Sequence, residues 1–561
     1  MHSADFAYVA LYFAALAVGT PLCGTWLARV LQGRPPRALA WLGPVERAVY
    51  RVGGVDAGAE MAWRAYAGAL VALHAAGFVG LLGLQLAQAH LPLNPAGPGA
   101  VPLGVAVNTA VSFVTNTNWQ AYAGEATLGY LTQMLGLGVQ NFLSAATGLA
   151  VLAAVARGFA RNSAAGLGNF WADLVRVTVY VLLPLSFVLA VVLVAQGTVM
   201  SFAPYARATT LAGTEQVIPL GPAAAQIAIK QLGTNGGGFF GQNSAHPFEN
   251  PTPLTNALQA LALLLLPAAG VHAYGLLTGA RRHAWVVWGV MAAFFAAGLG
   301  LSLGSEYAAP GAATLAAEGK EVRFGPTPSV LWATATTAAS NGSVNAMHGS
   351  LSPLAGGVAL LNMLLGEIVF GGAGSGLYGM VAMIVLAVFL AGLMVGRTPE
   401  YLGKKIEAAE VRLAAVAVLA PCAATLLGAA AALATEAGRA AVGSAGPHAL
   451  TEVLYAWGSM ANNNGSAFAS LTATGDLYTW GGALAMLVGR FAVLVPMLAL
   501  AGGLAAKKTV PPSGGTFPTD GPLFAALLAG VIVLVAALTY FPVLTLGPVL
   551  EHLCLAAGKT L

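Results

Sequence analysis

The sequence predicts an all-α protein that crosses a membrane many times. Of its 561 residues, 58% are hydrophobic and only 8% are charged, whereas roughly 25% of the residues in a typical soluble domain are charged. The mean hydropathy is +0.76. Crossing about 30 Å of hydrocarbon takes about 20 helical residues, and ten apolar runs are long enough. They lie near residues 5–29, 63–89, 128–156, 174–197, 254–278, 284–303, 354–395, 412–435, 481–506 and 522–542.

The sequence argues against a cleaved signal peptide, a nucleic-acid partner and a site built from cysteines. No Lys or Arg precedes the first apolar run, whereas a cleaved signal peptide opens with a basic segment, so we expect a retained first helix. The net charge is only +4 and is spread along the chain, which argues against a nucleic-acid partner. The cysteines, Cys23, Cys422 and Cys554, are far apart, so neither a disulfide framework nor a zinc site is indicated.

The basic residues predict how the chain is threaded through the membrane. Cytoplasmic loops collect Lys and Arg, and sixteen of the 24 basic residues fall on alternate connections. That face is therefore predicted to be inside, and an even number of spans leaves both termini outside. The sixteen are Arg29, Arg34, Arg37, Arg47, Arg51, Arg157, Arg161, Arg176, Arg281, Arg282, Arg397, Lys404, Lys405, Arg412, Lys507 and Lys508.

Residues 231–241, QLGTNGGGFFG, are the most glycine-rich polar stretch of the chain. The three consecutive glycines lose helix propensity at about 1 kcal/mol each, and they tolerate positive backbone angles. We therefore expect an extended loop that turns its carbonyl oxygens to one side.

Three weaker copies of this stretch occur, at residues 114–120, 340–345 and 462–467. The four copies are 118, 106 and 123 residues apart, which suits a fourfold repeat with two membrane helices in each unit. Asn118 stands where the others have glycine, and asparagine also tolerates a left-handed backbone. The aligned triplets are Asn116, Thr117 and Asn118; Thr234, Asn235 and Gly236; Ser340, Asn341 and Gly342; and Asn463, Asn464 and Gly465.

A short apolar segment precedes each copy, at residues 103–114, 223–232, 328–339 and 448–460. These segments are too short to span a bilayer, as re-entrant helices are. The order helix, pore helix, extended loop, helix, repeated four times, is the layout of a potassium-channel-like pore. The predicted units are a first helix with a basic loop (1–62), four pore repeats (63–160, 161–280, 281–410 and 411–508), and a last helix with an external C-terminus (509–561).

Such loops select ions through their backbone. Rings of carbonyl oxygens replace the water around a dehydrated cation, and pore helices point their partly negative C-termini at the cavity. None of the four triplets contains a carboxylate. This favours potassium over calcium or magnesium, which prefer charged oxygen ligands.

A gate is predicted in the seventh run, 354–395, which is too long for one simple span. Four glycines interrupt it just after Glu367, and a broken helix at this point would close the inner exit of the pore. The charge of Arg490 lies inside a predicted span, so we expect it to face a cavity or a partner helix, with Glu367 as a candidate partner. The glycines are Gly371, Gly372, Gly374 and Gly376.

Six motifs together resemble the potassium-binding A subunit of the Kdp potassium-transporting ATPase. The resemblance covers essentially the whole chain, and only Gly241 and Gln242, in the outer vestibule, depart from the usual pattern of that family. The motifs are TNTNWQAYAGE (115–125), GTNGGGFF (233–240), NSAHPFENPTPLTN (243–256), SNGSVNAMHGSLSPL (340–354), GRTPEYLGKKIE (396–407) and NNNGSAFASL (462–471).

This resemblance implies the ion-selecting subunit of a bacterial inner-membrane complex that takes up potassium. A P-type ATPase subunit would use the ATP, smaller subunits would complete the complex, and this chain would have no catalytic residues of its own. It also implies that Gln120 lies beside the filter and influences potassium affinity. Glu367, Arg397 and Arg490 would match polar positions on the inner side of the pore.

Two other interpretations stay open at the level of sequence. A self-sufficient transporter of the Trk, Ktr or HKT kind shares the four-repeat pore but needs no ATPase, although one extra span at each end favours the Kdp interpretation. A glycine-rich membrane scaffold without transport is a more distant alternative. The GxGxxG at residues 374–379 follows no predicted strand, so we interpret it as a helix break and not as a dinucleotide site.

Overall fold

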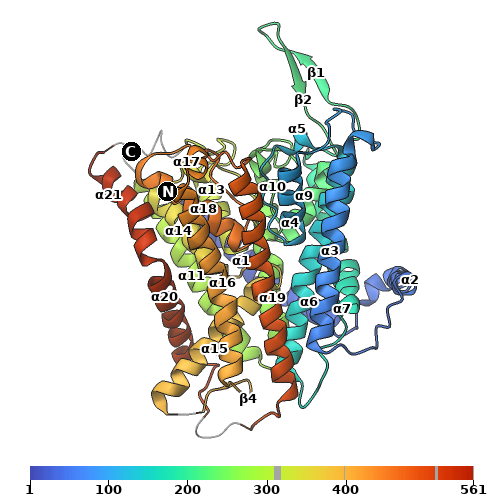
Figure 1. The fold of residues 1–561 in the computed structure, drawn as a ribbon, viewed down its shortest axis with the longest axis vertical. Helices are drawn as coiled ribbons and strands as arrows, with labels where there is room; N and C mark the ends of the chain where they lie inside the picture. Colours follow the sequence, from blue (N-terminus) through green and yellow to red (C-terminus); the bar gives the residue numbers. More distant parts are fainter. Residues whose placement is uncertain (309–316, 397, 512–515, 560–561) are drawn as a thin grey trace.

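The computed structural model describes residues 1–308, 317–396, 398–511 and 516–559. Within these residues the protein is mostly helical, and ten helices are long and apolar enough to cross a membrane (Figure 1). Each of the ten predicted spans overlaps one of them, so the predicted number is confirmed, although the seventh run, 354–395, overlaps only in its second half. They are Ser3–Leu31, Trp63–His90, Thr132–Ala160, Phe170–Ala195, Pro253–Thr278, Arg281–Ala308, Ser375–Met394, Ala408–Ala434, Leu477–Ala506 and Pro522–Ala556.

Several of these spans are composite, because a short π-helical or 3-10 segment precedes, follows or joins their α-helical parts. In chain order the spans contain the following elements: α1 (Ser3–Leu31), α3 (Trp63–Ala87) with η2 (Gln88–His90), η3 (Thr132–Gly138) with α6 (Val139–Ala160), α7 (Phe170–Val177), η4 (Thr178–Leu182) and α8 (Leu183–Ala195), α10 (Pro253–Thr278), α11 (Arg281–Ala308), α15 (Ser375–Val395), α16 (Ala408–Ala434), η7 (Leu477–Gly481) with α19 (Gly482–Ala506), and α20 (Pro522–Leu544), η8 (Thr545–Val549) and α21 (Leu550–Ala556).

The seventh apolar run is broken, as its glycines predict. It forms α14 (Pro353–Leu364) and then α15, separated by residues 365–374. The backbone in between has positive φ angles at Gly366, Glu367, Phe370, Gly371 and Gly374. A right-handed helix cannot continue through such angles.

The four predicted short helices are present. They are α4 (Leu103–Val114), α9 (Ala223–Leu232), α13 (Pro326–Ala338) and α18 (Gly446–Ala461). Most of their residues are buried, polar ones included, so these helices lie inside the bundle and not at its surface. Each ends next to one of the four polar loops.

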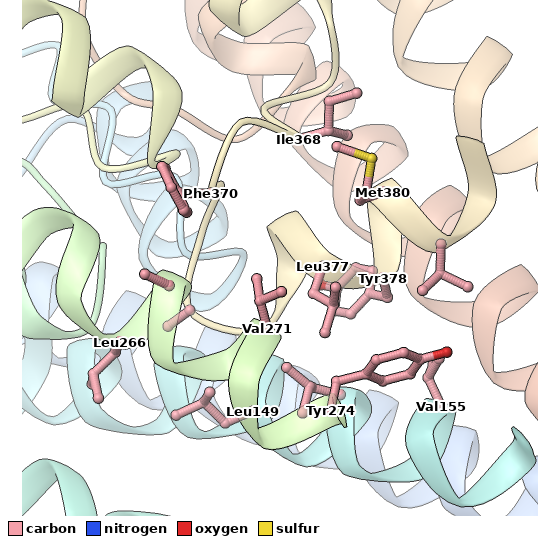
Figure 2. Close-up of a cluster of buried hydrophobic side chains, with 14 of the residues drawn as sticks. Leu149, Val155, Leu266, Val271, Tyr274, Ile368, Phe370, Leu377, Tyr378 and Met380 are labelled. Carbon is pink, nitrogen blue, oxygen red and sulfur yellow. The ribbon is translucent and has the colours of Figure 1, made fainter. Parts of the chain in front are cut away.

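The core forms where α6 and α10 pass each other. Leu149 of α6 and Val271 and Tyr274 of α10 pack beside Phe370 and Leu377 around the broken helix (Figure 2). The two helices are mostly buried, whereas α1 and α20 expose most of their surface. The centre of the protein is therefore the region that contains the short helices and their loops.

Smaller elements lie at the two ends of the bundle. A hairpin of β1 (Ala206–Thr209) and β2 (Glu215–Ile218) projects from the end that also carries both chain termini (Figure 1). A two-residue pairing of β3 (Glu400–Tyr401) with β4 (Lys404–Lys405) lies at the opposite end. The remaining elements are η1 (Arg37–Leu42), α2 (Gly43–Gly53), α5 (Gly124–Thr127), η5 (Asn243–Ala245), η6 (His348–Ser350) and α17 (Glu436–Ala440).

Candidate functional site

The four polar loops share one backbone pattern. We name them the first loop (115–120), the second loop (233–238), the third loop (340–345) and the fourth loop (462–467). In every loop the first and third residues of the aligned triplet have a positive φ. Asn118 keeps this shape with a φ of 53°, because asparagine tolerates the left-handed region that the other loops reach with glycine. The other residues are Asn116, Thr234, Gly236, Ser340, Gly342, Asn463 and Gly465.

Near the end of the helix before each loop, a carbonyl oxygen accepts hydrogen bonds from backbone N–H groups of the loop. The carbonyl oxygen of Lys230 accepts hydrogen bonds from the backbone N–H groups of Asn235, at 2.9 Å, and Gly236, at 3.3 Å. In the first loop the carbonyl oxygen of Ser112 binds the N–H groups of Thr117 and Asn118 in the same way. The last turn of each helix thereby fixes where its loop begins.

The first loop contacts the second loop. Asn116 Nδ2 donates to the carbonyl oxygen of Thr234 at 2.9 Å, and Asn118 Nδ2 donates to that of Gly236 at 3.2 Å. In return, Asn235 Nδ2 donates to Asn116 Oδ1 at 2.5 Å. Each carbonyl oxygen has a second lone pair, so these bonds leave it able to accept another partner.

The second loop, with the end of α9 before it, contacts the third loop, and the third loop, with the end of α13 before it, contacts the fourth. Asn341 Nδ2 donates to the carbonyl oxygen of Lys230 at 2.8 Å. One loop further on, Asn464 Nδ2 makes the corresponding bond to the carbonyl oxygen of Thr336 at 3.0 Å. Ser340 Oγ also donates to the carbonyl oxygen of Asn463 at 3.0 Å.

The fourth loop returns to the first loop. Asn463 Nδ2 donates to Thr117 Oγ1 at 2.9 Å, between residues that are 346 positions apart in the chain. The contacts therefore form a closed ring in which each loop touches the next. All twelve residues of the four triplets belong to this ring, and Gln120 adjoins it.

Three glycines are required where neighbouring loops meet. A Cβ atom at Gly236 would collide with the carbonyl oxygen of Asn341, one at Gly342 with that of Asn464, and one at Gly465 with that of Thr117. Backbone therefore meets backbone around the ring, and a side chain at these positions would force neighbouring loops apart.

One side of the ring opens into a hollow of about 450 Å³. The third triplet residues Asn118, Gly342 and Gly465 line it, together with Gly237. Gln120 also lines the hollow, where its Nε2 donates to the carbonyl oxygen of Gly238 at 3.0 Å and its Oε1 accepts from the Gly238 N–H at 2.7 Å.

The opposite side of the ring faces a smaller cavity of about 80 Å³. Here the lining includes the first triplet residues Ser340 and Asn463. Glu367 and Arg490 line the same cavity. The ring thus separates two spaces, and the gate candidates Glu367 and Arg490 both lie on the side of the smaller one.

The break between α14 and α15 lies against the face of the ring that borders the smaller cavity. The Ala373 N–H donates to Thr234 Oγ1 at 2.8 Å, and Asn464 Nδ2 donates to Glu367 Oε1 at 2.7 Å. A Cβ atom at Gly372 would lie 3.3 Å from the Cβ atom of Ser340. The predicted gate segment is therefore in contact with three of the four loops.

Three glycines at this break pack on backbone. A Cβ atom at Gly374 would collide with the carbonyl oxygen of Gly148 in α6, and Gly371 and Gly376 lie against each other in the same manner. Gly148 was not predicted, because nothing in the sequence of α6 marks it among the many glycines of membrane helices.

The suggested pairing of Arg490 with Glu367 is wrong. Both residues lie in the described part of the chain and form no ion pair there. Arg490 is buried and its Nη2 donates to the carbonyl oxygen of Ser144 at 2.9 Å. The hydroxyl of Ser144 in turn donates to Asn116 Oδ1 at 2.7 Å, so the arginine is connected to the first loop. Arg397, the remaining gate candidate, lies outside the described residues.

The buried ion pair of Lys230 with Glu249 was not predicted. Lys230 has no exposed side-chain surface and pairs with Glu249, which is equally buried. Glu249 Oε1 accepts from the N–H groups of Phe239, at 2.7 Å, and Phe240, at 3.1 Å. The signal that could have found Glu249 is its place in the motif NSAHPFENPTPLTN, eight residues beyond Gly241.

Comparison with known proteins identifies the family. Residues 10–553 match the family described as "KdpA: Potassium-transporting ATPase A subunit". The chain belongs to this family. A relative from Sorangium cellulosum, named "Potassium-transporting ATPase potassium-binding subunit", is 57% identical over 568 residues, which cover 97% of this chain and 98% of the relative. Relatives with the same name from Rhodospirillum centenum and Methylibium petroleiphilum are 53% and 52% identical and cover 98% and 100% of this chain, and 97% and 100% of their own lengths.

Among solved structures, this KdpA-family chain is similar to the potassium transporter TrkH from Vibrio parahaemolyticus. The TM-score is 0.49 and the sequence identity is 16%, over 74% of this chain and 81% of that chain. At this level the similarity decides neither the fold nor the function. The resemblance to the Kdp A subunit that the motifs indicated is confirmed by the family match and the relatives.

Proposed function

We propose that this chain is the potassium-binding and translocating subunit of an ATP-driven potassium uptake complex. The observation that carries the proposal is the closed ring of four loops from one polypeptide, in a chain of the KdpA family. The ring residues carry no acidic side chain, and their carbonyl oxygens are the ligands that suit a dehydrated monovalent cation. In this proposal the ten spans comprise four pore repeats, 63–160, 161–280, 281–410 and 411–508, with one extra helix at each end.

In this mechanism the ion enters from the 450 Å³ hollow and loses its water as it reaches the ring. The four short helices direct the negative ends of their dipoles toward the ion, which lowers the cost of dehydration. The ring is asymmetric, since its residues differ from loop to loop, and such asymmetry favours one tightly held ion over a queue. Gln120 holds Gly238 at the outer edge of the ring.

The proposed gate is the segment 365–374, which contains the cavity residue Glu367 and is assisted by Arg490 in the same cavity. It contacts the inner face of the ring, so an ion can leave inward only if the segment moves or if another route opens beside it. The positive charge of Arg490 lies in the same cavity and opposes the stay of a cation there. Gly371, Gly372, Gly374 and Gly376 would set the position of the closed segment.

The same proposal covers partners and location. A P-type ATPase catalytic subunit would bind and hydrolyse ATP, smaller accessory subunits would complete the complex, and this chain would supply no catalytic residue. The complex would lie in the bacterial inner membrane. The basic connections would face the cytoplasm, so that both termini and the β1–β2 hairpin lie outside.

Potassium binding to the purified chain tests the filter assignment. We expect Gly236→Asp and Gly342→Asp to lower potassium affinity and the preference for potassium over sodium, because each side chain collides with a neighbouring carbonyl oxygen. Gly97→Asp is the matched control, because Gly97 also has a positive φ but has open space around its Cβ position. Equal affinities of parent and variants for both ions would overturn the assignment.

Flux measurements separate the proposal from a Trk-like transporter. Liposomes that contain only the purified chain are expected to show no sustained potassium current, whereas liposomes with the complete ATPase complex should take up potassium only when ATP is present. A steady ATP-independent current through the chain alone would favour the Trk, Ktr or HKT alternative. A chain that binds no ion at all would favour a scaffold.

A further inference from the structure

The segment between α1 and α3 carries apolar side chains that stay exposed among the described residues of this chain. Neither η1 nor α2 contains a buried residue. Trp41 is 71% exposed and Val52 is 90% exposed. Clustered apolar side chains on a surface indicate an interaction site, and the figure shows α2 projecting sideways from the helical bundle (Figure 1).

The apolar residues of α2 lie on one face. Val45, Val49 and Val52 are spaced by four and three residues, which is the helical period. Trp41 precedes Val45 by one more turn. Arg47 and Arg51 are spaced by four residues and fall on the opposite face. The helix is therefore amphipathic, with an apolar stripe and a basic stripe.

A third face of α2 holds the helix to the bundle in a fixed orientation. Glu46 accepts hydrogen bonds from Tyr180 Oη at 2.7 Å, Tyr50 Oη at 2.9 Å and Arg176 Nε at 3.1 Å. Burial by itself would raise the pKa of Glu46, but these hydrogen bonds and the charge of Arg176 lower it below its usual value. An ionised Glu46 thus keeps the valines turned away from the protein.

The level of α2 matches a membrane surface. Its partner Arg176 lies in the second turn of α7, which begins at Phe170, so α2 runs beside the first turns of a spanning helix. The nearby arginines are exposed and have no ion-pair partner among the described residues. These are Arg34, Arg37, Arg47 and Arg51.

We propose that η1 and α2 form an in-plane anchor in the membrane leaflet at this end of the protein, with Trp41, Val45, Val49 and Val52 inserted among lipid chains and the arginines bound to anionic phospholipid headgroups. Amphipathic helices with this composition lie with the apolar face about 5–10 Å below the headgroups. Tryptophan and arginine together suit a lipid surface, whereas nothing on α2 indicates a complementary protein. In the orientation proposed above, this is the cytoplasmic leaflet.

Spin labels test the depth of the helix directly. Cys23, Cys422 and Cys554 are replaced by serine, and a label is attached at Val49→Cys or, as the matched control, Arg51→Cys. Both proteins are studied as the full complex in nanodiscs of phosphatidylcholine with phosphatidylglycerol. We expect collisions of the label at position 49 with lipid-soluble oxygen to exceed those with a water-soluble nickel chelate, and the reverse at position 51.

Two results with the label at position 49 would contradict the proposal, and they can be told apart. Greater collision with the nickel chelate would place the valine face in water and overturn the proposal. Low collision with both reagents would mean that protein covers this face, which also overturns it. Neither result depends on potassium binding, so the test stands apart from the proposed function.

Lipid retention tests the basic stripe. The variant Arg47→Gln/Arg51→Gln is compared with Arg207→Gln/Arg439→Gln, which removes two exposed arginines at the other end of the molecule. Each arginine near an anionic surface changes lipid partition by about fivefold. We expect at least that loss of co-purified phosphatidylglycerol, counted by native mass spectrometry, in the first variant alone. Equal retention by both variants would exclude the anionic preference.

Discussion

Lys230 forms an ion pair with Glu249 at a place where neither side chain reaches solvent. The same Nζ donates to the carbonyl oxygen of Gly237 at 2.9 Å and to Asn243 Oδ1 at 3.1 Å. The pair therefore joins the end of α9, the second loop and the segment that follows it. A buried charge pair of this kind stabilises the structure only while both partners are present.

Replacement of the lysine alone is expected to be severe. Lys230→Met leaves the carboxylate of Glu249 buried without its counter-charge, which costs about 3–5 kcal/mol. Thermal unfolding in detergent measures the loss. Lys230→Met/Glu249→Gln removes both charges and keeps an acceptor for the Phe239 N–H, so it should recover much of the stability. A single variant that unfolds at the parent temperature would show that the pair contributes nothing.

Gln120→Ala tests the outer edge of the ring. Two hydrogen bonds between Gln120 and Gly238 are lost, at about 1 kcal/mol each, and we expect potassium affinity to fall by up to about thirtyfold. Titration calorimetry with potassium measures the change. Gln242→Ala is the control, because Gln242 lines the same hollow without a hydrogen bond to the ring. If both variants bind like the parent, Gln120 does not position the filter.

Gly374→Ala tests the proposed gate. The new Cβ atom collides with the carbonyl oxygen of Gly148, and the φ of 85° is strained for alanine. The segment 365–374 should be displaced from the ring, so that rubidium leaks through reconstituted complex without ATP. Gly356→Ala in α14 has open space and should stay tight. Fully ATP-coupled flux in a folded Gly374→Ala protein would place the gate elsewhere.

The contact between His448 and Glu551 predicts a pH effect on stability. His448 Nδ1 lies 2.8 Å from Glu551 Oε1, and this hydrogen bond raises the pKa of His448 above 6.5 although burial opposes it. Because the folded pKa is the higher one, the stabilisation is complete below about pH 6.5 and is lost as the pH rises through the folded pKa.

The size of this pH effect should be at most about 1 kcal/mol, as for other partly exposed pairs. The unfolding temperature at pH 6.0 and pH 8.5 measures it, and His448→Gln should remove the difference that belongs to this pair. An identical pH dependence in parent and variant would contradict the assignment.

Much of the fold follows from local sequence. Hydropathy and length located all ten spans, and the short apolar segments predicted α4, α9, α13 and α18 within a few residues, because helix length and burial are local properties. A left-handed backbone at the third triplet position was also expected from Asn118 and the glycines, but the positive φ angles of Thr234 and Ser340 at the first position were not.

The contacts between distant residues were not predictable in the same way. The hydrogen bond from Arg490 to Ser144 joins residues 346 positions apart, and the pairing of Arg490 with Glu367 was wrong because charge alone does not fix where a guanidinium points. The close approach of Gly374 to Gly148 likewise depends on how α6 packs, which a single sequence does not reveal.

In a pore formed by four identical subunits, one codon change alters all four subunits. In this protein a codon change alters only one of the four loops, because one gene encodes all four loops in a single chain. If the ring selects the ion as proposed, natural variation is expected to tune ion preference in small steps, and a second change in a neighbouring loop should be able to compensate a damaging one. Double variants across adjoining loops, such as Asn116 with Asn235, should accordingly reveal strong genetic interactions, while loops on opposite sides should vary independently.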